Sequence, residues 1–274
     1  MQSDSWDFDR LTSEEQSIIV SLIAADTLAK TNAGCRKVCV TDSFYARYGK
    51  RLLDICISLP AVILTLPINL IIGIITLFDV GLPLFYAQDR IGRNGRLFKL
   101  VKFRNMTNEC DEHGVILPAD ERITKWGNFA RRTSLDELLN FVSVLKGDMA
   151  LIGPRPLPKV YMGRFNDTHE ARHSVRPGLE CPLHDDAMQY MTWQNRLDND
   201  AWYVENISLS TDFKLLLRLF KMAFGGDDKA ARGQGGSEGT FMGYDFDGRV
   251  MDSKHIPDEY YERMRSIVSE RDQA

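Results

Sequence analysis

Residues 52–78 read LLDICISLPAVILTLPINLIIGIITLF, and the only charged side chain in these 27 positions is that of Asp54. An α-helix needs about 20 apolar residues to cross the hydrocarbon core of a bilayer. The segment is therefore long enough either to cross a membrane or to enter it and return. The alternative is a buried core helix of a soluble protein, but such helices are usually shorter.

Two prolines interrupt this segment, Pro60 and Pro67. Pro67 lies near the middle, where lipid cannot replace the hydrogen bond that a proline removes. A kinked or re-entrant helix accommodates it better than a straight span. Both flanks are basic, whereas a single span concentrates its cations on one side, so the pattern indicates a hairpin with both ends in the cytoplasm. The flanking cations are Lys50 and Arg51 before the segment, and Arg90, Arg93, Arg96 and Lys99 after it.

The chain as a whole has a globular composition. Of its 274 residues, 44% are hydrophobic and 26% are charged, which excludes a disordered or collagen-like chain. The formal net charge of −4 argues against a general nucleic-acid binder, which would be basic. The five cysteines are irregularly spaced and do not make a disulfide framework, so we expect reduced thiols in the cytoplasm.

We expect an α+β protein in four parts. The membrane segment divides a polar N-terminal region from the residues that carry the chemical motifs, and a Gly-rich stretch precedes the last helix. The four parts are an N-terminal extension with an amphipathic helix (1–48), a re-entrant membrane helix-hairpin (49–80), a mostly helical cytoplasmic catalytic domain with a small β-hairpin (81–224), and a flexible C-terminal tail with a short helix (225–274).

Two local signals place elements in these parts. Ser13 and Gln16 have the spacing of a capping box at the start of the amphipathic helix, over about 13–30. Asn94-Gly95 is a strong turn signal, and it predicts a β-hairpin over 81–106.

Cationic side chains gather on the second strand of the predicted hairpin. Alternate residues of a strand share a face, so Lys102 and Arg104 should point the same way. A basic face beside a membrane segment suits either substrate phosphates or anionic lipid head groups. Charge alone does not distinguish the two.

The stretch 131–138, RRTSLDEL, has two interpretations. Ser134 and Glu137 have the spacing of a capping box, with Asp136 in the first turn of the helix, and this accounts for the pattern without any chemistry. The same geometry favours phosphate binding at a helix N-terminus. There Asp136, with Arg131 nearby and a divalent cation to offset charge repulsion, could attack phosphorus as a nucleophile.

Prolines flank an arginine in the sequence Gly153-Pro154-Arg155-Pro156. They restrict the backbone and so reduce the entropy lost when the guanidinium binds an anion. We expect an anion contact at Arg155, with a simple turn as the alternative.

Several short motifs follow one another in a defined order. They are Lys50-Arg51-x-x-Asp54, Pro67, Gln88-x-Arg90-x-Gly92, Lys102-Phe103-Arg104-x-Met106, Ser134-Leu135-Asp136-Glu137-Leu138, Leu145-Lys146-Gly147-Asp148-Met149, Gly153-Pro154-Arg155-Pro156-Leu157, Arg172-His173-x-Val175-x-Pro177-Gly178 and Asp200-x-x-Tyr203. Each motif alone is weak, but the ordered set over roughly residues 49–247 resembles the bacterial sugar transferase family, the monotopic phosphoglycosyl transferases.

The resemblance implies a reaction and a location. Members of the family have a re-entrant membrane helix and move a sugar phosphate from a UDP-sugar to polyprenyl (undecaprenyl) phosphate, releasing UMP. The reaction proceeds through a covalent aspartyl-phosphosugar and needs Mg²⁺. The implied place is the cytoplasmic face of the bacterial inner membrane, in contact with inner-leaflet lipid, at the first membrane step of a surface glycan such as an exopolysaccharide. A homodimer or a partner protein of the glycan pathway is plausible, and nucleic acid is not expected.

The resemblance also assigns roles to residues of this chain. Asp136 would be the nucleophile and the metal ligand, and Glu137 would assist it. The residues expected to bind substrate are Lys102, Arg104, Arg131, Pro154, Arg155 and Asp200.

The chain departs from the family pattern in two places. Leu66 stands before Pro67 where the family usually has Ser, which can bond carbonyls freed at a helix break. The loop over 178–192 lacks the family's Gly, Gln and Arg and contains Cys181, His184, Asp185 and Asp186 instead. Acidic side chains beside a nucleotide diphosphate would repel it unless a cation intervenes. A second hypothesis is therefore a catalytically weak paralogue that acts as a membrane-anchored subunit of a glycan-assembly complex.

Overall fold

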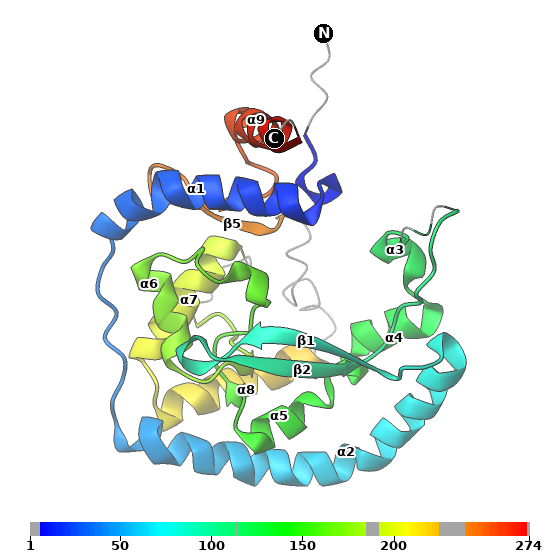
Figure 1. Ribbon diagram of the computed structural model, residues 1–274. Coiled ribbons are helices and arrows are strands. Elements are labelled where there is room, and N and C mark those ends of the chain that lie inside the picture. Colours follow the sequence, from blue (N-terminus) through cyan, green and yellow to red (C-terminus); the bar gives the residue numbers. More distant parts are fainter. Residues whose placement is uncertain (1–5, 113, 115, 185–191, 225–238, 273–274) are drawn as a thin grey trace. The chain divides into compact units, whose positions relative to one another are not determined.

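The structure is a computed structural model that describes residues 6–112, 114, 116–184, 192–224 and 239–272 (Figure 1). It mixes helices and strands, in agreement with the expected α+β class. The Gly-rich stretch 225–238 and the two acids of the altered loop, Asp185 and Asp186, lie outside the described residues.

The apolar segment forms one long helix, α2 (Lys50–Val80), which follows a helical turn at Tyr45–Gly49. It contains Pro60 and Pro67 without interruption, and it curves along its length (Figure 1). Among the described residues, only Tyr45–Val80 is a helix long and apolar enough to cross a membrane. Only 17% of its most apolar window is buried within the protein, unlike a core helix of a soluble protein.

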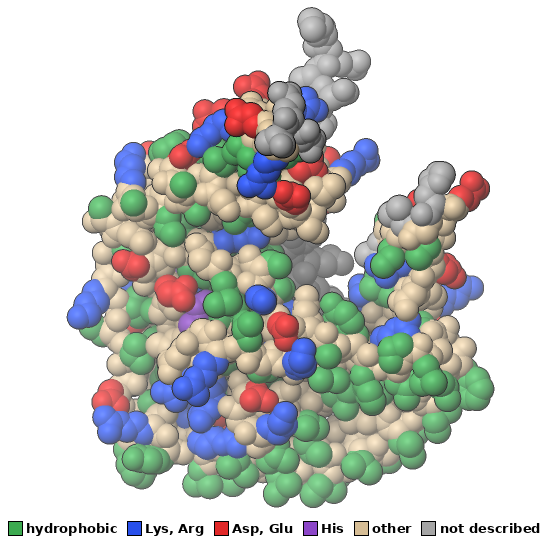
Figure 2. Space-filling view, in the orientation of Figure 1, with side chains coloured by type: hydrophobic (Ala, Val, Ile, Leu, Met, Phe, Trp, Pro, Cys, Tyr) green, Lys and Arg blue, Asp and Glu red, His purple; other side chains and the backbone are tan. Residues whose placement is uncertain are grey.

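The outer surface of α2 is a continuous band of exposed apolar side chains. Figure 2 shows this band along the lower edge of the molecule, where Figure 1 places α2. Its members include Leu52, Leu59, Ile63, Leu64, Leu66, Ile68, Leu70, Ile71, Ile74, Leu77 and Phe78. A band of this extent on a soluble monomer would be an interaction surface or an aggregation hazard, and it fits a helix that contacts lipid.

Contacts divide the chain into two compact units. One unit comprises Asp42–Lys159 and Val175–Glu180. The four-part division expected from the sequence stays a prediction.

The predicted hairpin is confirmed within this unit. It consists of β1 (Phe85–Ile91) and β2 (Leu97–Phe103), which pair in antiparallel fashion. Asn94 and Gly95 form its turn with φ values of 55° and 72°. Both values are in the left-handed region, which Asn and Gly adopt more readily than other residues.

Short elements follow the hairpin in the same unit. They are α3 (Ala119–Arg122), α4 (Lys125–Thr133), the 3₁₀ turn η4 (Leu135–Glu137), α5 (Asn140–Lys146) and β3 (Ala150–Ile152). β3 pairs in parallel with β4 (Gly178–Glu180). Leu100, Val144, Met149 and Leu151 form the core beneath these elements.

The motif Lys50-Arg51-x-x-Asp54 attaches α2 to this core. Arg51 donates from Nη1 to the Val144 carbonyl (2.6 Å) and from Nη2 to the Leu145 carbonyl (2.7 Å), at the C-terminal end of α5. The buried Asp54 accepts a hydrogen bond from the backbone N–H of Leu151 in β3 (2.9 Å). The start of α2 is thus bonded to the strand that leads into the Arg155 loop.

The other unit joins the two ends of the chain. It contains α1 (Ser13–Ala33), α6 (Asp167–Glu170), α7 (Trp193–Glu205), α8 (Leu209–Phe224), β5 (Phe241–Tyr244), β6 (Val250–Asp252) and α9 (Asp258–Asp272). α1 packs against β5 and α9. Its core includes Ile19, Ile23, Met242, Tyr260 and Met264.

The capping box predicted at Ser13 and Gln16 is wrong by one residue. The helix begins at Ser13, and the capping residue is Thr12, whose side chain accepts from the N–H of Glu15 while Glu15 accepts from the N–H of Thr12. A capping residue must lie outside the helix in an extended conformation, which Thr12 adopts (φ −62°, ψ 158°).

Candidate active site

The turn that carries Asp136 and Glu137 is made by the end of one helix, and not by the start of another. α4 closes at Ser134, whose left-handed conformation (φ 57°) directs its N–H to the carbonyls of Ala130 and Arg131. Ser134 makes no side-chain cap, and Asp136 and Glu137 follow in η4. The capping box considered at Ser134 and Glu137 is therefore wrong, because a capping residue needs extended backbone and because Glu137 bonds to other residues. The helix N-terminus expected to hold phosphate beside Asp136 is wrong for the same reason, since Ser134 ends α4.

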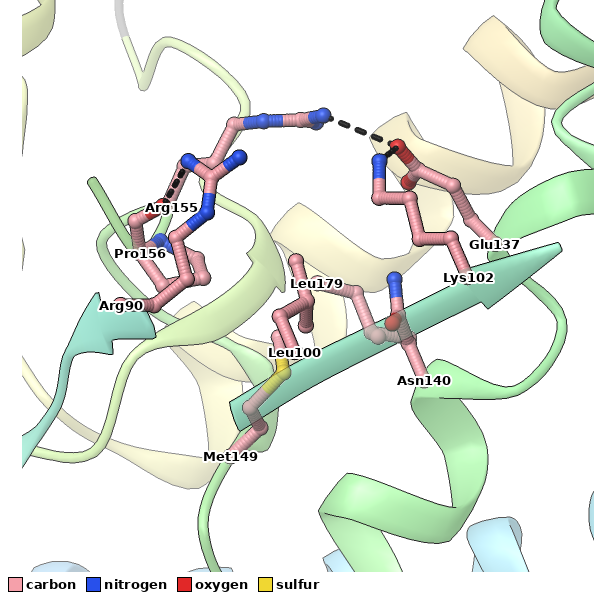
Figure 3. Close-up of a pocket in the computed structure, with 9 residues that line it drawn as sticks. All are labelled: Arg90, Leu100, Lys102, Glu137, Asn140, Met149, Arg155, Pro156 and Leu179. Carbon is pink, nitrogen blue, oxygen red and sulfur yellow. Dashed lines mark hydrogen bonds and ion pairs between the residues drawn. The ribbon is translucent and has the colours of Figure 1, made fainter. Parts of the chain in front are cut away.

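Glu137 is held by two cations from distant parts of the chain. Its Oε1 atom lies 2.5 Å from Lys102 Nζ on β2 and 3.1 Å from Arg155 Nη2 (Figure 3). Burial alone would raise the pKa of Glu137, but the charges of Arg155 and Lys102 and their hydrogen bonds lower it to about 2. Glu137 is therefore an anion throughout the physiological range, and it keeps both cations in place.

Asp136 has a different environment. It is 5% exposed, and its Oδ2 atom accepts from Asn105 Nδ2 at 3.2 Å. Burial raises its pKa above the ordinary value, Lys102 opposes this, and the charge of Glu137 adds to it. Two adjacent carboxyl groups whose pKa values are shifted in opposite directions are typical of sites where they have different roles.

Asn105 is a site residue that the sequence reasoning missed. Besides donating to Asp136, it accepts from Arg131 Nη2 through Oδ1 at 3.0 Å. It thereby links the predicted nucleophile to a predicted phosphate-binding cation. The available signal was its position between Arg104 and Met106, inside one of the motifs.

Two glycines allow the backbone approaches on which this site depends. A Cβ on Gly127 of α4 would lie 2.0 Å from the carbonyl oxygen of Asn105, and one on Gly178 would lie 2.2 Å from the Gly153 nitrogen. Both distances are far below van der Waals contact. Gly127 therefore lets α4 pack on Asn105, and Gly178 lets β4 approach the Arg155 loop.

A small pocket lies between Lys102 and Glu137 on one side and Arg90 and Arg155 on the other. Figure 3 shows Lys102 and Glu137 directed toward each other, and Arg155 reaching toward Glu137 from the opposite side. Its polar residues could contact phosphate groups, and its apolar ones exclude water. The lining residues are Arg90, Leu100, Lys102, Glu137, Asn140, Met149, Arg155, Pro156 and Leu179.

Three predicted substrate-binding residues have structural contacts of their own. Arg104 is buried beyond the end of β2 and donates to the Pro83 carbonyl (3.1 Å). Pro154 accepts a hydrogen bond from the N–H of Gly178 (3.0 Å). Asp200 belongs to the other unit, where its carboxylate pairs with Arg172 at 2.9 Å, and both side chains are buried.

No group of three His, Cys, Asp or Glu side chains that could hold a metal ion occurs in the described part of the chain. Mg²⁺ usually takes one or two carboxylates, with substrate phosphates and water completing its shell. Asp136 fits this role, because its Oδ2 atom accepts a hydrogen bond from a neutral amide, whereas Glu137 is already paired with two cations.

Comparison with known proteins gives a consistent result. The family model described as bacterial sugar transferase matches residues 45–226. An uncharacterized sugar transferase of Bacillus subtilis, EpsL, is 37% identical over 167 residues, which are 61% of this chain and 83% of the relative. An undecaprenyl-phosphate galactose phosphotransferase of Salmonella typhimurium is 32% identical over 194 residues, 65% of this chain but 40% of that protein.

A third relative also matches more than half of this chain but less than half of its own length. The UDP-N-acetylgalactosamine-undecaprenyl-phosphate N-acetylgalactosaminephosphotransferase of Aeromonas hydrophila is 31% identical over 180 residues, 63% of this chain and 43% of the relative. The chain thus spans most of the Bacillus protein and less than half of the other two.

Proposed function

This chain belongs to the bacterial sugar transferase family, and we propose that it is a phosphoglycosyl transferase that moves a sugar 1-phosphate from a UDP-sugar to polyprenyl phosphate. The observation that carries the proposal is the pair of Asp136 and Glu137. One carboxylate is buried beside a neutral amide, and the other is bound to two cations. Relatives whose names specify undecaprenyl phosphate support the choice of acceptor.

Asp136 is the nucleophile in this proposal. A carboxylate oxygen attacks the β-phosphorus of the donor, and the bond from that phosphorus to the bridging oxygen breaks. The electron pair leaves with UMP, and a phosphosugar remains on Asp136. An oxygen of polyprenyl phosphate then attacks the same phosphorus and displaces the carboxylate, which regenerates the enzyme.

The neighbouring residues prepare Asp136 for this step. Asn105 orients the carboxylate by its 3.2 Å hydrogen bond to Oδ2. Lys102 and Arg155 supply positive charge where the phosphates of the donor must lie. A magnesium ion held by Asp136 would neutralise phosphate charge when bound.

The apolar helix accounts for the lipid substrate. We propose that α2 enters the inner leaflet of the bacterial cytoplasmic membrane and returns to the cytoplasmic face. The exposed band of α2 supports lipid contact, and the bonds of Arg51 and Asp54 attach it to the catalytic unit. A polyprenyl chain in the leaflet could then present its phosphate to the site.

The test is UMP release by purified protein with Mg²⁺, polyprenyl phosphate and a panel of UDP-sugars. Asp136→Asn should abolish release, because an amide is a far weaker nucleophile. Asp148→Asn is the matched control, since Asp148 pairs only loosely with Lys146 (3.4 Å). Unchanged release by Asp136→Asn would contradict the mechanism.

A catalytically weak, membrane-anchored subunit is the second candidate. It is favoured by the ion pair between Arg155 and Glu180, an acid in the altered loop (2.8 Å). Absence of UMP release with every donor, from folded protein, would favour this candidate.

A further inference from the structure

Glu180 lies beside the arginine proposed to bind phosphate. It is the last residue of β4, opposite Ile152 of β3, and its carbonyl accepts from the N–H of Gly153 at 3.3 Å. Its Oε2 atom is 2.8 Å from Arg155 Nη1. Arg155 lies three residues after the end of β3, in the loop that leaves the strand beside Glu180, so the pairing of β3 and β4 brings the two side chains close.

Arg155 is therefore shared between two carboxylates. Nη1 contacts Glu180, and Nη2 contacts Glu137 at 3.1 Å. The charge of Glu180 is the largest influence on the pKa of Arg155 and raises it. Burial lowers this pKa, and the charge of Glu137 raises it further. The charge of the guanidinium is thus balanced by protein groups, and a phosphate that binds Arg155 competes with them for it.

Glu137 and Glu180 differ in which cation remains beside them when Arg155 binds a phosphate. Glu137 keeps its 2.5 Å contact with Lys102 when Arg155 turns to a phosphate. The Glu180 side chain is only 18% exposed, so solvent does little to compensate when it loses its cation. Carboxylate and phosphate present similar oxygen acceptors to a guanidinium, which makes Glu180 a direct competitor.

We propose that Glu180 is a resident counter-ion of Arg155, which competes with nucleotide phosphate for the guanidinium and so promotes the release of UMP. This inference rests on the proposed function, since it assumes that UMP leaves from the pocket beside Arg155. When UMP departs, Glu180 regains Arg155, and no buried charge is left unbalanced. Glu180 thus limits the affinity of the site for product.

The experiment measures the dissociation constant of UMP by calorimetry, with the full-length protein in detergent and Mg²⁺ present. Glu180→Gln keeps the shape of the side chain and removes its charge. We expect it to bind UMP roughly fivefold to tenfold more tightly than the wild type, because one repulsive charge near the phosphate is gone. Glu180→Ala should also bind UMP more tightly. Because alanine has no amide, tighter binding by both variants would show that the lost charge, and not a hydrogen bond from the glutamine amide, is the cause.

Asp89→Asn is the matched control. Asp89 pairs with Lys99 at 3.2 Å on the exposed part of the hairpin, and its loss should leave UMP binding unchanged. Equal or weaker binding by Glu180→Gln and Glu180→Ala, with unfolding temperatures like that of the wild type, would mean that Glu180 positions Arg155, and would overturn the inference alone. Failure of the wild type to bind UMP would overturn the proposed function, and the inference with it.

Discussion

Asp136 and Glu137 are adjacent in the chain, yet their carboxyl groups are held in opposite electrostatic environments. Burial raises the pKa of Asp136, whereas Arg155 and Lys102 outweigh burial at Glu137 and lower its pKa to about 2. The 3₁₀ turn directs the two side chains to different neighbours. One carboxylate can therefore react while the other organises the cations.

The pH dependence of the reaction should report on Asp136. In the proposed mechanism only its ionised form attacks phosphorus, so the rate should fall as the pH decreases through its raised pKa, at a higher pH than an ordinary Asp would give. Glu137 stays ionised over this range. The measurement is kcat/KM for UMP release as a function of pH.

Glu137→Gln should shift this acid limb to lower pH. The negative charge of Glu137 raises the pKa of Asp136, and the variant removes that charge and leaves Lys102 free to stabilise the Asp136 carboxylate. The residual activity should therefore persist to lower pH than that of the wild type. A shift of the acid limb to higher pH in Glu137→Gln would contradict this, because it would mean that Glu137 lowers the pKa of Asp136. Asp148→Asn should leave the profile unchanged.

Asn105→Ala should lower kcat by about 10-fold to 100-fold, because Asp136 loses the hydrogen bond that orients it and Arg131 loses its link to the site. The KM for the donor should change less. Asn105→Asp would place a second negative charge beside Asp136 and should be at least as damaging. Activity like that of the wild type in Asn105→Ala would exclude a role in orientation.

Gly178→Ala should destabilise the unit formed by Asp42–Lys159 and Val175–Glu180 by about 2 kcal/mol or more, because the new Cβ would overlap the Gly153 backbone. The unfolding temperature and the activity should fall together. Gly34→Ala is a suitable control, since a Cβ there meets only Thr31 O, at 3.6 Å. An unchanged unfolding temperature in Gly178→Ala would contradict the close approach of the two backbones.

Asp54→Ala should reduce both stability and kcat. It leaves the buried N–H of Leu151 without its acceptor, at a cost of about 1–3 kcal/mol. It also loosens β3, which leads into the Arg155 loop. Asp54→Asn retains an oxygen acceptor and should recover most of the loss. Equal damage in both variants would mean that the charge of Asp54 matters more than the hydrogen bond.

The path of α2 can be tested by labelling single cysteines in a cysteine-free background. Tyr48 precedes α2 in the sequence and Phe85 follows it, and both side chains are exposed. The test uses the variants Tyr48→Cys and Phe85→Cys. Both should react with an impermeant reagent from the cytoplasmic side only, if the helix enters the membrane and returns. Labelling of the two positions from opposite sides would establish a full crossing instead.

The sequence was sufficient for those features that depend on short stretches of chain. The apolar run predicts a helix and Asn94-Gly95 predicts the hairpin turn, because both depend on local composition and backbone preference. The helix-hairpin expected at Pro67 is not seen, since α2 is one continuous helix. The ordered motifs predict the family, and they include Asp136 and Glu137. Both expected capping boxes were wrong, since S-x-x-E or S-x-x-Q spacing does not specify which residue has extended backbone.

The sequence did not predict which charged side chains contact one another. Lys102 lies 35 residues before Glu137, and Arg155 lies 18 residues after it. Only the packing of β2, η4 and the Arg155 loop brings the three within hydrogen-bonding distance. The same holds for Asn105, which approaches Asp136 because Gly127 lets α4 lie against its backbone.

The sequence by itself determined the family, the long apolar helix and the two carboxylates. Only the tertiary structure decided that Asp136 lies beside a neutral amide, that Glu137 holds two cations, and that Glu180 shares Arg155. Residue type is a local property of the chain, whereas the pKa of a carboxyl group and the availability of a guanidinium depend on burial and on charges from distant segments.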